Sequence, residues 1–180
     1  IRGVRLIAPI LDELSKRCDL RLDFVTDVKY FQFLNKYIEK ETFVLLKKDL
    51  RGMIGSANLI PWTPENLVYA AKASNVAVIP IDLSVPMQRL KPENRLLIMW
   101  RLGLPCLTSP SPAYERVSRK AGVTAISNTP AEWFQNLSRL LNEPNFASDE
   151  ILKAQNFLRE NHNESILLRK WDAAIESVTG

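Results

Sequence analysis

The spacing of apolar side chains changes along the first third of the chain. Between Gly3 and Arg17 they recur three and four positions apart, which predicts an amphipathic helix, and Leu20–Val25 alternates between apolar and charged residues, which predicts a strand. We expect a helix over Phe31–Lys40. The short apolar run Phe43–Leu46 fits either a helix or a strand.

A regular alternation of strands and helices follows. Strand Asn58–Trp62 leads to a helix that has Thr63 as its N-cap and Pro64 at its first position, and that runs to about Ser74. The unbroken apolar run VAVIPI at 76–81 is typical of a strand buried on both faces. The remaining expected elements are a polar loop over Asp82–Lys91, a helix over Pro92–Leu102, a strand over Pro105–Ser109, a helix over Pro112–Lys120, a strand over Val123–Ile126, a helix from Pro130 to Leu141, and helices over Ser148–Asn161 and Ser165–Ser177.

Strands that alternate with helices over short connections predict βαβ units, a parallel sheet and right-handed crossovers. We therefore expect an α/β fold, a three-layer Rossmann-like domain over residues 1–180, with a mostly parallel sheet flanked by helices and with C-terminal helical segments. Such a domain usually opens on a central strand, whereas this chain opens on a helix at Ile1 and without a methionine. We expect the first strand to lie upstream and the chain to be one lobe of a larger protein.

Composition narrows the classes of function. The 180 residues are 46% hydrophobic and 24% charged, and they contain neither a membrane-spanning run nor a signal peptide, so a cytoplasmic protein is expected. The net charge of +4 favours an anionic partner, but the basic residues are spread along the chain and do not favour nucleic acid. Two cysteines and one histidine predict no metal site and no Ser/His/Asp triad, and glycine-rich phosphate loops are absent from the sequence. No cofactor is expected.

The loop after the VAVIPI strand carries the main candidate site. Ligands of open parallel sheets bind beyond the carboxyl ends of the strands, where helix N-termini favour anions. Lys91, Asn94 and Arg95 lie at the start of the next predicted helix, where cations oppose the helix dipole unless an anion binds between them. The alternative interpretation is that Lys91 and Arg95 are solvated and that Glu93 alone complements the dipole.

Other strand ends offer further candidates. Trp62, followed by Thr63, could stack a nucleobase, although a tryptophan there is more often part of the packing. Asp82 lies in the polar loop, and the segment from Ser111 to Tyr114 follows a third strand; the Tyr114 hydroxyl could meet a ligand or the residue could be a partly buried anchor.

The order of these segments resembles the C-terminal, donor-binding half of GT-B glycosyltransferases. The residues that carry the resemblance are VAVIPID, KPENRLL, a helix closing in GLP, the strand CLTSP, then SPAYERV and AGVTAISNTPAEWFQNLSRLL, with a late tryptophan in RKWDAAI. It runs from about Gly3 to the end of the chain and is strongest from Asn58 to Leu141.

This resemblance implies that the chain binds a nucleotide-diphosphate sugar. It implies that the cationic groups hold the diphosphate and stabilise the charge that develops on it as the sugar departs. It further implies that an N-terminal lobe, missing here, holds the acceptor and any catalytic base, so that the fragment alone is inactive; peripheral association with the inner face of the membrane would occur through that lobe. The implied contacts are Lys91, Asn94 and Arg95 with the diphosphate, Trp62 and Thr63 with the nucleobase or ribose, and Asp82, Ser111 and Tyr114 with the sugar or phosphate.

The sequence departs from this family at two places. Many retaining members carry two glutamates before the glycine of GxP, and the corresponding positions here are Leu90 and Ile98. The change fits a divergent subfamily that relies on the Lys91, Asn94 and Arg95 cluster, or a lobe that binds no donor. Two other functions stay open: a non-catalytic Rossmann-like binding module and, ranked lower because His162 is the single histidine, a sugar-phosphate enzyme such as an isomerase.

Overall fold

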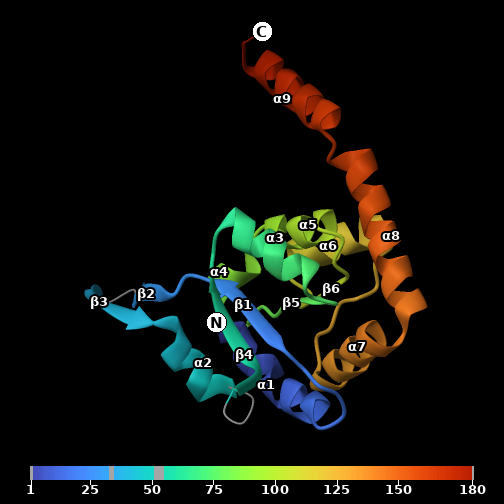
Figure 1. Ribbon diagram of the computed structural model, residues 1–180. Coiled ribbons are helices and arrows are strands. Elements are labelled where there is room, and N and C mark those ends of the chain that lie inside the picture. Colours follow the sequence, from blue (N-terminus) through green and yellow to red (C-terminus); the bar gives the residue numbers. More distant parts are fainter. Residues whose placement is uncertain (1, 33–34, 51–54, 180) are drawn as a thin grey trace.

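A computed structural model describes residues 2–32, 35–50 and 55–179, which form an α/β fold (Figure 1). Its helices are α1 (Arg2–Ser15), α2 (Thr42–Leu50), α3 (Pro64–Lys72), α4 (Pro86–Arg89), α5 (Asn94–Arg101), α6 (Pro112–Ala121), α7 (Pro130–Asn142), α8 (Pro144–Asn161) and α9 (Glu164–Thr179). Its strands are β1 (Leu22–Thr26), β2 (Lys29–Gln32), β3 (Asn35–Glu41), β4 (Ala57–Pro61), β5 (Ala77–Ile79) and β6 (Cys106–Thr108).

Short parallel strand pairs form the middle layer. β1 pairs with β4, β5 pairs with β6, and Thr108 at the end of β6 makes one further parallel bridge to Ile126. Helices α3, α5 and α6 cover one side of these strands, and α1 and α7 cover the other (Figure 1). The predicted three-layer, Rossmann-like α/β class is therefore confirmed.

Local capping explains where several helices begin. The side-chain oxygens of Thr63, Ser111 and Thr129 accept hydrogen bonds from backbone N–H groups in the first turns of α3, α6 and α7, and each of these helices has a proline in its first turn. Thr129 and Glu132 complete a capping box. At the other end of α6, Gly122 adopts a left-handed conformation with φ 70°, which glycine allows without steric cost.

Large side chains from three helices fill the core between the layers. Trp100 of α5, Tyr114 of α6 and Trp133 of α7 are all buried, and α1 contributes the apolar face that the sequence predicts, with Ile7 and Leu11 buried. The core therefore anchors α5 and α6 firmly, and their N-termini are the elements that build the candidate site.

The predicted helix over Phe31–Lys40 is wrong. The described residues of this segment form the antiparallel pair β2 and β3, with Lys29 opposite Glu41 and Phe31 opposite Glu39, and the pair extends away from the sheet (Figure 1). The Lys29 ammonium also contacts the Glu39 carboxylate at 2.7 Å. Cross-strand pairing between residues ten positions apart decides the structure here, and helical spacing does not report it.

Three other expectations need correction. The Asp82–Lys91 segment is not wholly a loop, because Pro86 starts the single-turn helix α4. β5 ends at Ile79, before the predicted end at Ile81, because Pro80 has no N–H and the N–H of Ile81 donates to the Ser109 hydroxyl at 2.9 Å.

The predicted strand Val123–Ile126 contributes a single bridge. The backbone N–H groups of Thr124 and Ala125 donate to the buried Glu150 carboxylate, at 2.7 and 2.9 Å, where a strand would use its amides in a ladder. A side chain from α8 thus replaces part of the sheet pairing.

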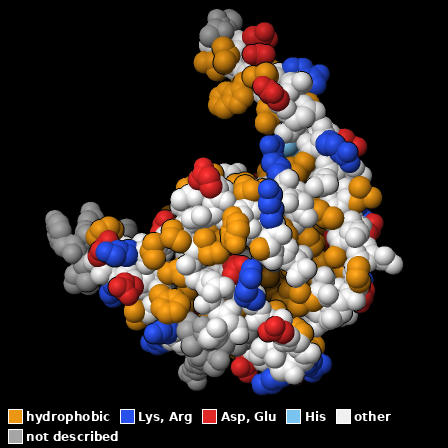
Figure 2. Space-filling model, viewed as in Figure 1, with side chains coloured by type: hydrophobic (Ala, Val, Ile, Leu, Met, Phe, Trp, Pro, Cys, Tyr) orange, Lys and Arg blue, Asp and Glu red, His pale blue; other side chains and the backbone are white. Residues whose placement is uncertain are grey.

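The last helix leaves the body of the domain. α9 projects beyond α8 (Figure 1), and hydrophobic side chains lie along it (Figure 2). Leu168, Trp171 and Val178 are all more than half exposed. The apolar positions follow the spacing of one helical face, so α9 exposes an amphipathic face at the surface.

Candidate functional site

The carboxyl ends of β5 and β6 lie at one edge of the sheet and are tied together. Chain segments leave these ends toward α5 and α6, and the hydrogen bond from the N–H of Ile81 to the Ser109 hydroxyl joins the two segments. The first turns of α5 and α6 consequently share this edge, which is where open α/β sheets bind their ligands.

Lys91 and Arg95 form a pair of neighbouring cations at the start of α5. Both side chains are exposed; partial desolvation lowers the pKa of the Lys91 ammonium, and the nearby charge of Arg95 lowers it further. Among the described residues, no carboxylate forms an ion pair with either side chain. Asn94, the first residue of α5, is exposed beside them. The positive charge at this helix end is therefore not neutralised by these ion pairs.

Glu93 does not serve as the counter-charge for this pair. Its two carboxylate oxygens accept hydrogen bonds from the Arg116 guanidinium of α6, at 3.0 and 3.2 Å. No side-chain capping bond is formed at the N-terminus of α5. The interpretation that Glu93 alone complements the helix dipole is therefore weakened, because this carboxylate links α5 to α6.

Tyr114 lies inside the domain next to this cation pair. The side chain is fully buried, and its hydroxyl makes no hydrogen bond of strict geometry, although the Arg95 guanidinium lies near enough to interact with it. Burial raises the pKa of Tyr114, and the charge of Arg95 partly opposes that rise. A buried hydroxyl without a partner is unusual in a folded protein and often marks a position where a ligand or water belongs.

Ser111 and Asp82 have structural roles in the described chain. Ser111 is fully buried and its hydroxyl accepts from the backbone N–H of Tyr114, which caps α6. The Asp82 carboxylate accepts from the N–H and the hydroxyl of Ser84, and its own N–H donates to the Gln88 side chain at 3.3 Å. Both residues lie at the predicted edge, and both shape the turns there.

Trp62 and Thr63 lie directly after the end of β4. The Trp62 side chain is 56% exposed, so it is not part of the core, and its backbone N–H donates to Thr26 on β1. Thr63 caps α3 through the N–H of Asn66. The structure thus leaves the Trp62 ring accessible but does not bring it into contact with Lys91 or Arg95.

His162 is placed by packing. Its ring lies against Phe157, with 5.4 Å between ring centroids, and its backbone carbonyl accepts from Arg101 at 2.8 Å. Burial lowers the pKa of the imidazole, which favours its neutral form. His162 follows α8 and lies at no strand end. This position agrees with the low rank given to a sugar-phosphate isomerase, which would need an acid or base at the ligand edge of the sheet.

Sequence reasoning missed the close contact made by Gly3. A Cβ atom built on this glycine would lie 2.0 Å from the carbonyl oxygen of Pro80, directly after β5. The first turn of α1 therefore touches the same sheet edge as the first turns of α5 and α6. A glycine near the start of a helical pattern was the available signal, but it names no neighbour.

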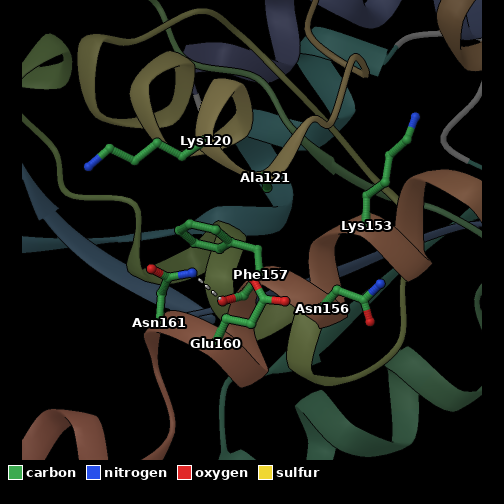
Figure 3. A pocket seen from close by; sticks show the side chains of 7 residues that line it. All are labelled: Lys120, Ala121, Lys153, Asn156, Phe157, Glu160 and Asn161. Carbon is green, nitrogen blue, oxygen red and sulfur yellow. Dashed lines mark hydrogen bonds between the residues drawn. The ribbon is translucent and has the colours of Figure 1, made fainter.

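A hollow of about 510 Å³ lies elsewhere, between the C-terminal part of α6 and α8 (Figure 3). Phe157 forms part of its lining, and the side chains of Lys120 and Lys153 extend away from each other (Figure 3). None of the predicted site residues lines it. Since its cations do not converge, it is not built as an anion site.

Comparison with known proteins shows a likeness of fold. No family model matches the chain, and no curated protein matches it in sequence. The fold is similar to the crystal structure of WaaG, a glycosyltransferase involved in lipopolysaccharide biosynthesis, with a TM-score of 0.65 at 13% sequence identity over 99% of this chain. The chain spans 43% of the length of that structure. The likeness at this identity concerns the fold.

Two features are absent from the described residues. No helix among them is long and apolar enough to cross a membrane. No group of His, Cys, Asp and Glu side chains within the same residues is arranged to hold a metal ion.

Proposed function

We propose that residues 1–180 form the donor-binding lobe of a glycosyltransferase and hold the diphosphate of a nucleotide-activated sugar at the start of α5. The observation that carries this proposal is the adjacent pair Lys91 and Arg95, which has no carboxylate partner among the described residues and stands at a helix N-terminus. Two cations at that place repel each other and interact unfavourably with the positive end of the helix dipole, and a bound diphosphate would compensate both effects.

The buried hydroxyl of Tyr114 supports the same position for the ligand. It lies close enough to Arg95 for the guanidinium to lower its pKa, and it makes no hydrogen bond of strict geometry. In the proposal, Asn94 donates its side-chain amide to the diphosphate, and the exposed ring of Trp62 stacks on the nucleobase. The fold likeness to a glycosyltransferase makes glycosyl transfer the first choice among anion-binding functions.

The proposed chemical role of the cations is to stabilise the leaving group. Negative charge grows on the diphosphate as the bond to the sugar breaks, and positive groups fixed in place lower the energy of that transition state. The acceptor and any catalytic base are assigned to a second lobe outside residues 1–180. The nucleotide sugar is the substrate, and the proposal requires no metal and no cofactor.

The test is a calorimetric titration with UDP, GDP and their sugars, repeated with Lys91→Ala and Arg95→Ala. A hydrogen bond to a charged group contributes about 1.5–3 kcal/mol, so each substitution should weaken binding about 10-fold or more. Lys120→Ala removes an equal charge from the exposed C-terminal part of α6 and serves as the matched control. Its affinity should equal that of the unmodified chain.

Two results would contradict the proposal in different ways. If no nucleotide binds at millimolar concentration, the donor-lobe assignment fails and a non-catalytic binding module becomes the better interpretation. If a nucleotide binds and both substitutions leave its affinity unchanged, the function survives and the assigned site is wrong.

A further inference from the structure

The guanidinium of Arg116 ties α6 to the residue that starts α5. One of its nitrogens donates to both carboxylate oxygens of Glu93, at 3.0 and 3.2 Å. The side chain of Arg116 is 57% exposed and that of Glu93 is 20% exposed, so water screens much of the attraction between them. An ion pair this exposed contributes little to stability, and the loss of Arg116 should therefore hardly change the fold.

Glu93 stands among the residues to which we assign the diphosphate. Its backbone carbonyl accepts the first hydrogen bond of α5, from the N–H of Leu97 at 3.1 Å, so it is the N-cap residue of this helix. Its side chain makes no capping bond. A carboxylate thus lies within two positions of all three assigned contacts, Lys91, Asn94 and Arg95.

The buried hydroxyl of Tyr114 indicates the same closeness in space. Burial raises the pKa of Tyr114, the charge of Arg95 opposes that rise, and the charge of Glu93 adds to it. Both charges therefore act on one buried group beside the start of α5. An unpaired carboxylate at that place would repel any phosphate that the neighbouring cations attract.

The ion pair with Arg116 removes this conflict of charges. At a separation of about 8 Å in water, an unpaired carboxylate weakens the binding of a doubly charged anion about 5-fold. A guanidinium bound to both carboxylate oxygens cancels most of this repulsion, because the two charges together act on the anion only as a dipole. It also occupies a carboxylate that could otherwise accept from the free N–H groups in the first turn of α5, where a phosphate oxygen would bind.

We propose that Arg116 is a positioning residue for the anion site at the start of α5, and that its pairing with Glu93 keeps this carboxylate from repelling or replacing the phosphate groups of the ligand. This role rests on the proposed function, because it requires an anion at Lys91 and Arg95. Arg116 acts through Glu93 and does not need to touch the ligand. A simple brace between α5 and α6 would behave differently, since the loss of either partner would then be equally harmful.

Calorimetric titration of the protein with UDP, GDP and inorganic pyrophosphate at low ionic strength tests this role. Arg116→Gln should weaken binding about 3–10-fold, because Glu93 loses its partner. Glu93→Gln should not weaken binding, since no carboxylate remains to be neutralised. The double variant, Arg116→Gln with Glu93→Gln, should bind within about 2-fold of the unmodified protein, and Arg116→Lys, which keeps the charge, should do the same.

The matched control is Arg119→Gln. Arg119 lies one turn further along α6, and its guanidinium pairs with Glu115 of the same helix at 3.1 Å, so its loss removes an equal charge and an exposed ion pair without touching α5. Its affinity should equal that of the unmodified protein. Salt gives a second measurement, because the loss in Arg116→Gln should shrink as the Debye length falls from about 30 Å at 0.01 M to about 8 Å at 0.15 M. A packing defect would not respond in this way.

The outcomes distinguish this role from the proposed function. If a nucleotide or pyrophosphate binds and Arg116→Gln leaves its affinity unchanged, Arg116 has no such role, whereas nucleotide binding would still support the proposed function. If Glu93→Gln and the double variant are as weak as Arg116→Gln, the pair is a brace and the proposal is wrong. If pyrophosphate alone binds and follows the expected pattern, the role holds and the nucleotide assignment fails. If neither a nucleotide nor pyrophosphate binds, both proposals fail.

Discussion

The contact between Gly3 and Pro80 makes a sharp prediction about stability. Gly3 lies in the first turn of α1, where alanine has the higher helix propensity, so an isolated helix would gain from Gly3→Ala. In this fold the added methyl group would lie 2.0 Å from the carbonyl oxygen of Pro80 and 2.7 Å from its carbonyl carbon. Both are backbone atoms, so no side-chain rotation can relieve the overlap.

The size of the effect follows from that distance. Ordinary contacts of a Cβ atom begin near 3.4 Å, so α1 and the end of β5 must separate by more than about 1 Å. Overpacking of this kind costs about 1–3 kcal/mol, and the propensity gain offsets up to about 1 kcal/mol. We expect Gly3→Ala to lower the free energy of unfolding by about 1–2 kcal/mol, which lowers Tm by about 2–8 °C in a chain of this size.

Urea unfolding followed by circular dichroism measures this loss. Gly55→Ala is the matched control, because nothing lies within 4 Å of a Cβ at Gly55 and its φ needs no glycine. The control should change the free energy of unfolding by less than about 0.5 kcal/mol. If Gly3→Ala is as stable as the unmodified chain, α1 does not start against Pro80, and the geometry of this sheet edge must be revised.

Three further substitutions test the capping, packing and site arguments. Glu150→Ala should lower the free energy of unfolding by about 3 kcal/mol, because it leaves the backbone amides of Thr124 and Ala125 without their acceptor. The control Asp149→Ala removes an exposed ion pair and should cost less than about 1 kcal/mol in the same urea titration. Backbone hydrogen bonds hold the pKa of Glu132 below its ordinary value. The contribution of Glu132 to stability is therefore present above its unfolded-state pKa and is lost as the pH falls through its folded-state pKa. NMR titration should show the low pKa, and Glu132→Gln should remove this pH dependence of stability. Tyr114→Phe should leave stability nearly unchanged, because the buried hydroxyl makes no hydrogen bond of strict geometry, and should weaken nucleotide binding in calorimetry. Unaltered affinity would exclude the hydroxyl from the site.

Elements with local signals were predictable from the sequence. Thr63 acts as an N-cap where the sequence places it, because the residue that caps a helix is its immediate neighbour. The VAVIPI run contains β5 for a similar reason, since continuous apolar character over a few residues is sufficient to mark a buried strand. These signals also fixed the order of elements from β4 to α7, and that order determines the α/β class.

Elements that depend on distant partners were not predictable. The pairing of β2 with β3 replaced the expected helix over Phe31–Lys40, and the Glu150 carboxylate took amides that the expected strand Val123–Ile126 would have used. In both cases the deciding contact joins residues that are 10 or more positions apart. Single-residue propensity and local periodicity contain no information about such contacts.

The candidate site was likewise predictable only where its features depend on neighbouring residues in the sequence. The presence of Lys91 and Arg95 at a helix start was visible in the sequence, because it conflicts with the dipole preference over neighbouring positions. The engagement of Glu93 by Arg116 and the complete burial of Tyr114 were not visible, because both depend on how α6 packs beside α5. The structure thus assigns Glu93 to Arg116, whereas Lys91 and Arg95 are exposed, as the solvated interpretation also expects.

The side chains of α5 show why this proposed site lies on its first turn. Leu96 and Trp100 are buried and hold the helix in the core, so the backbone at its N-terminus is fixed in place. Ile98 is 40% exposed and can offer a ligand apolar contact only. The polar side chains at the start of this helix are Asn94 and Arg95, with Lys91 just before it, and these groups suit phosphate oxygens better than sugar hydroxyls. A donor bound here would be held mainly by its diphosphate, and the choice of sugar would fall to residues outside α5.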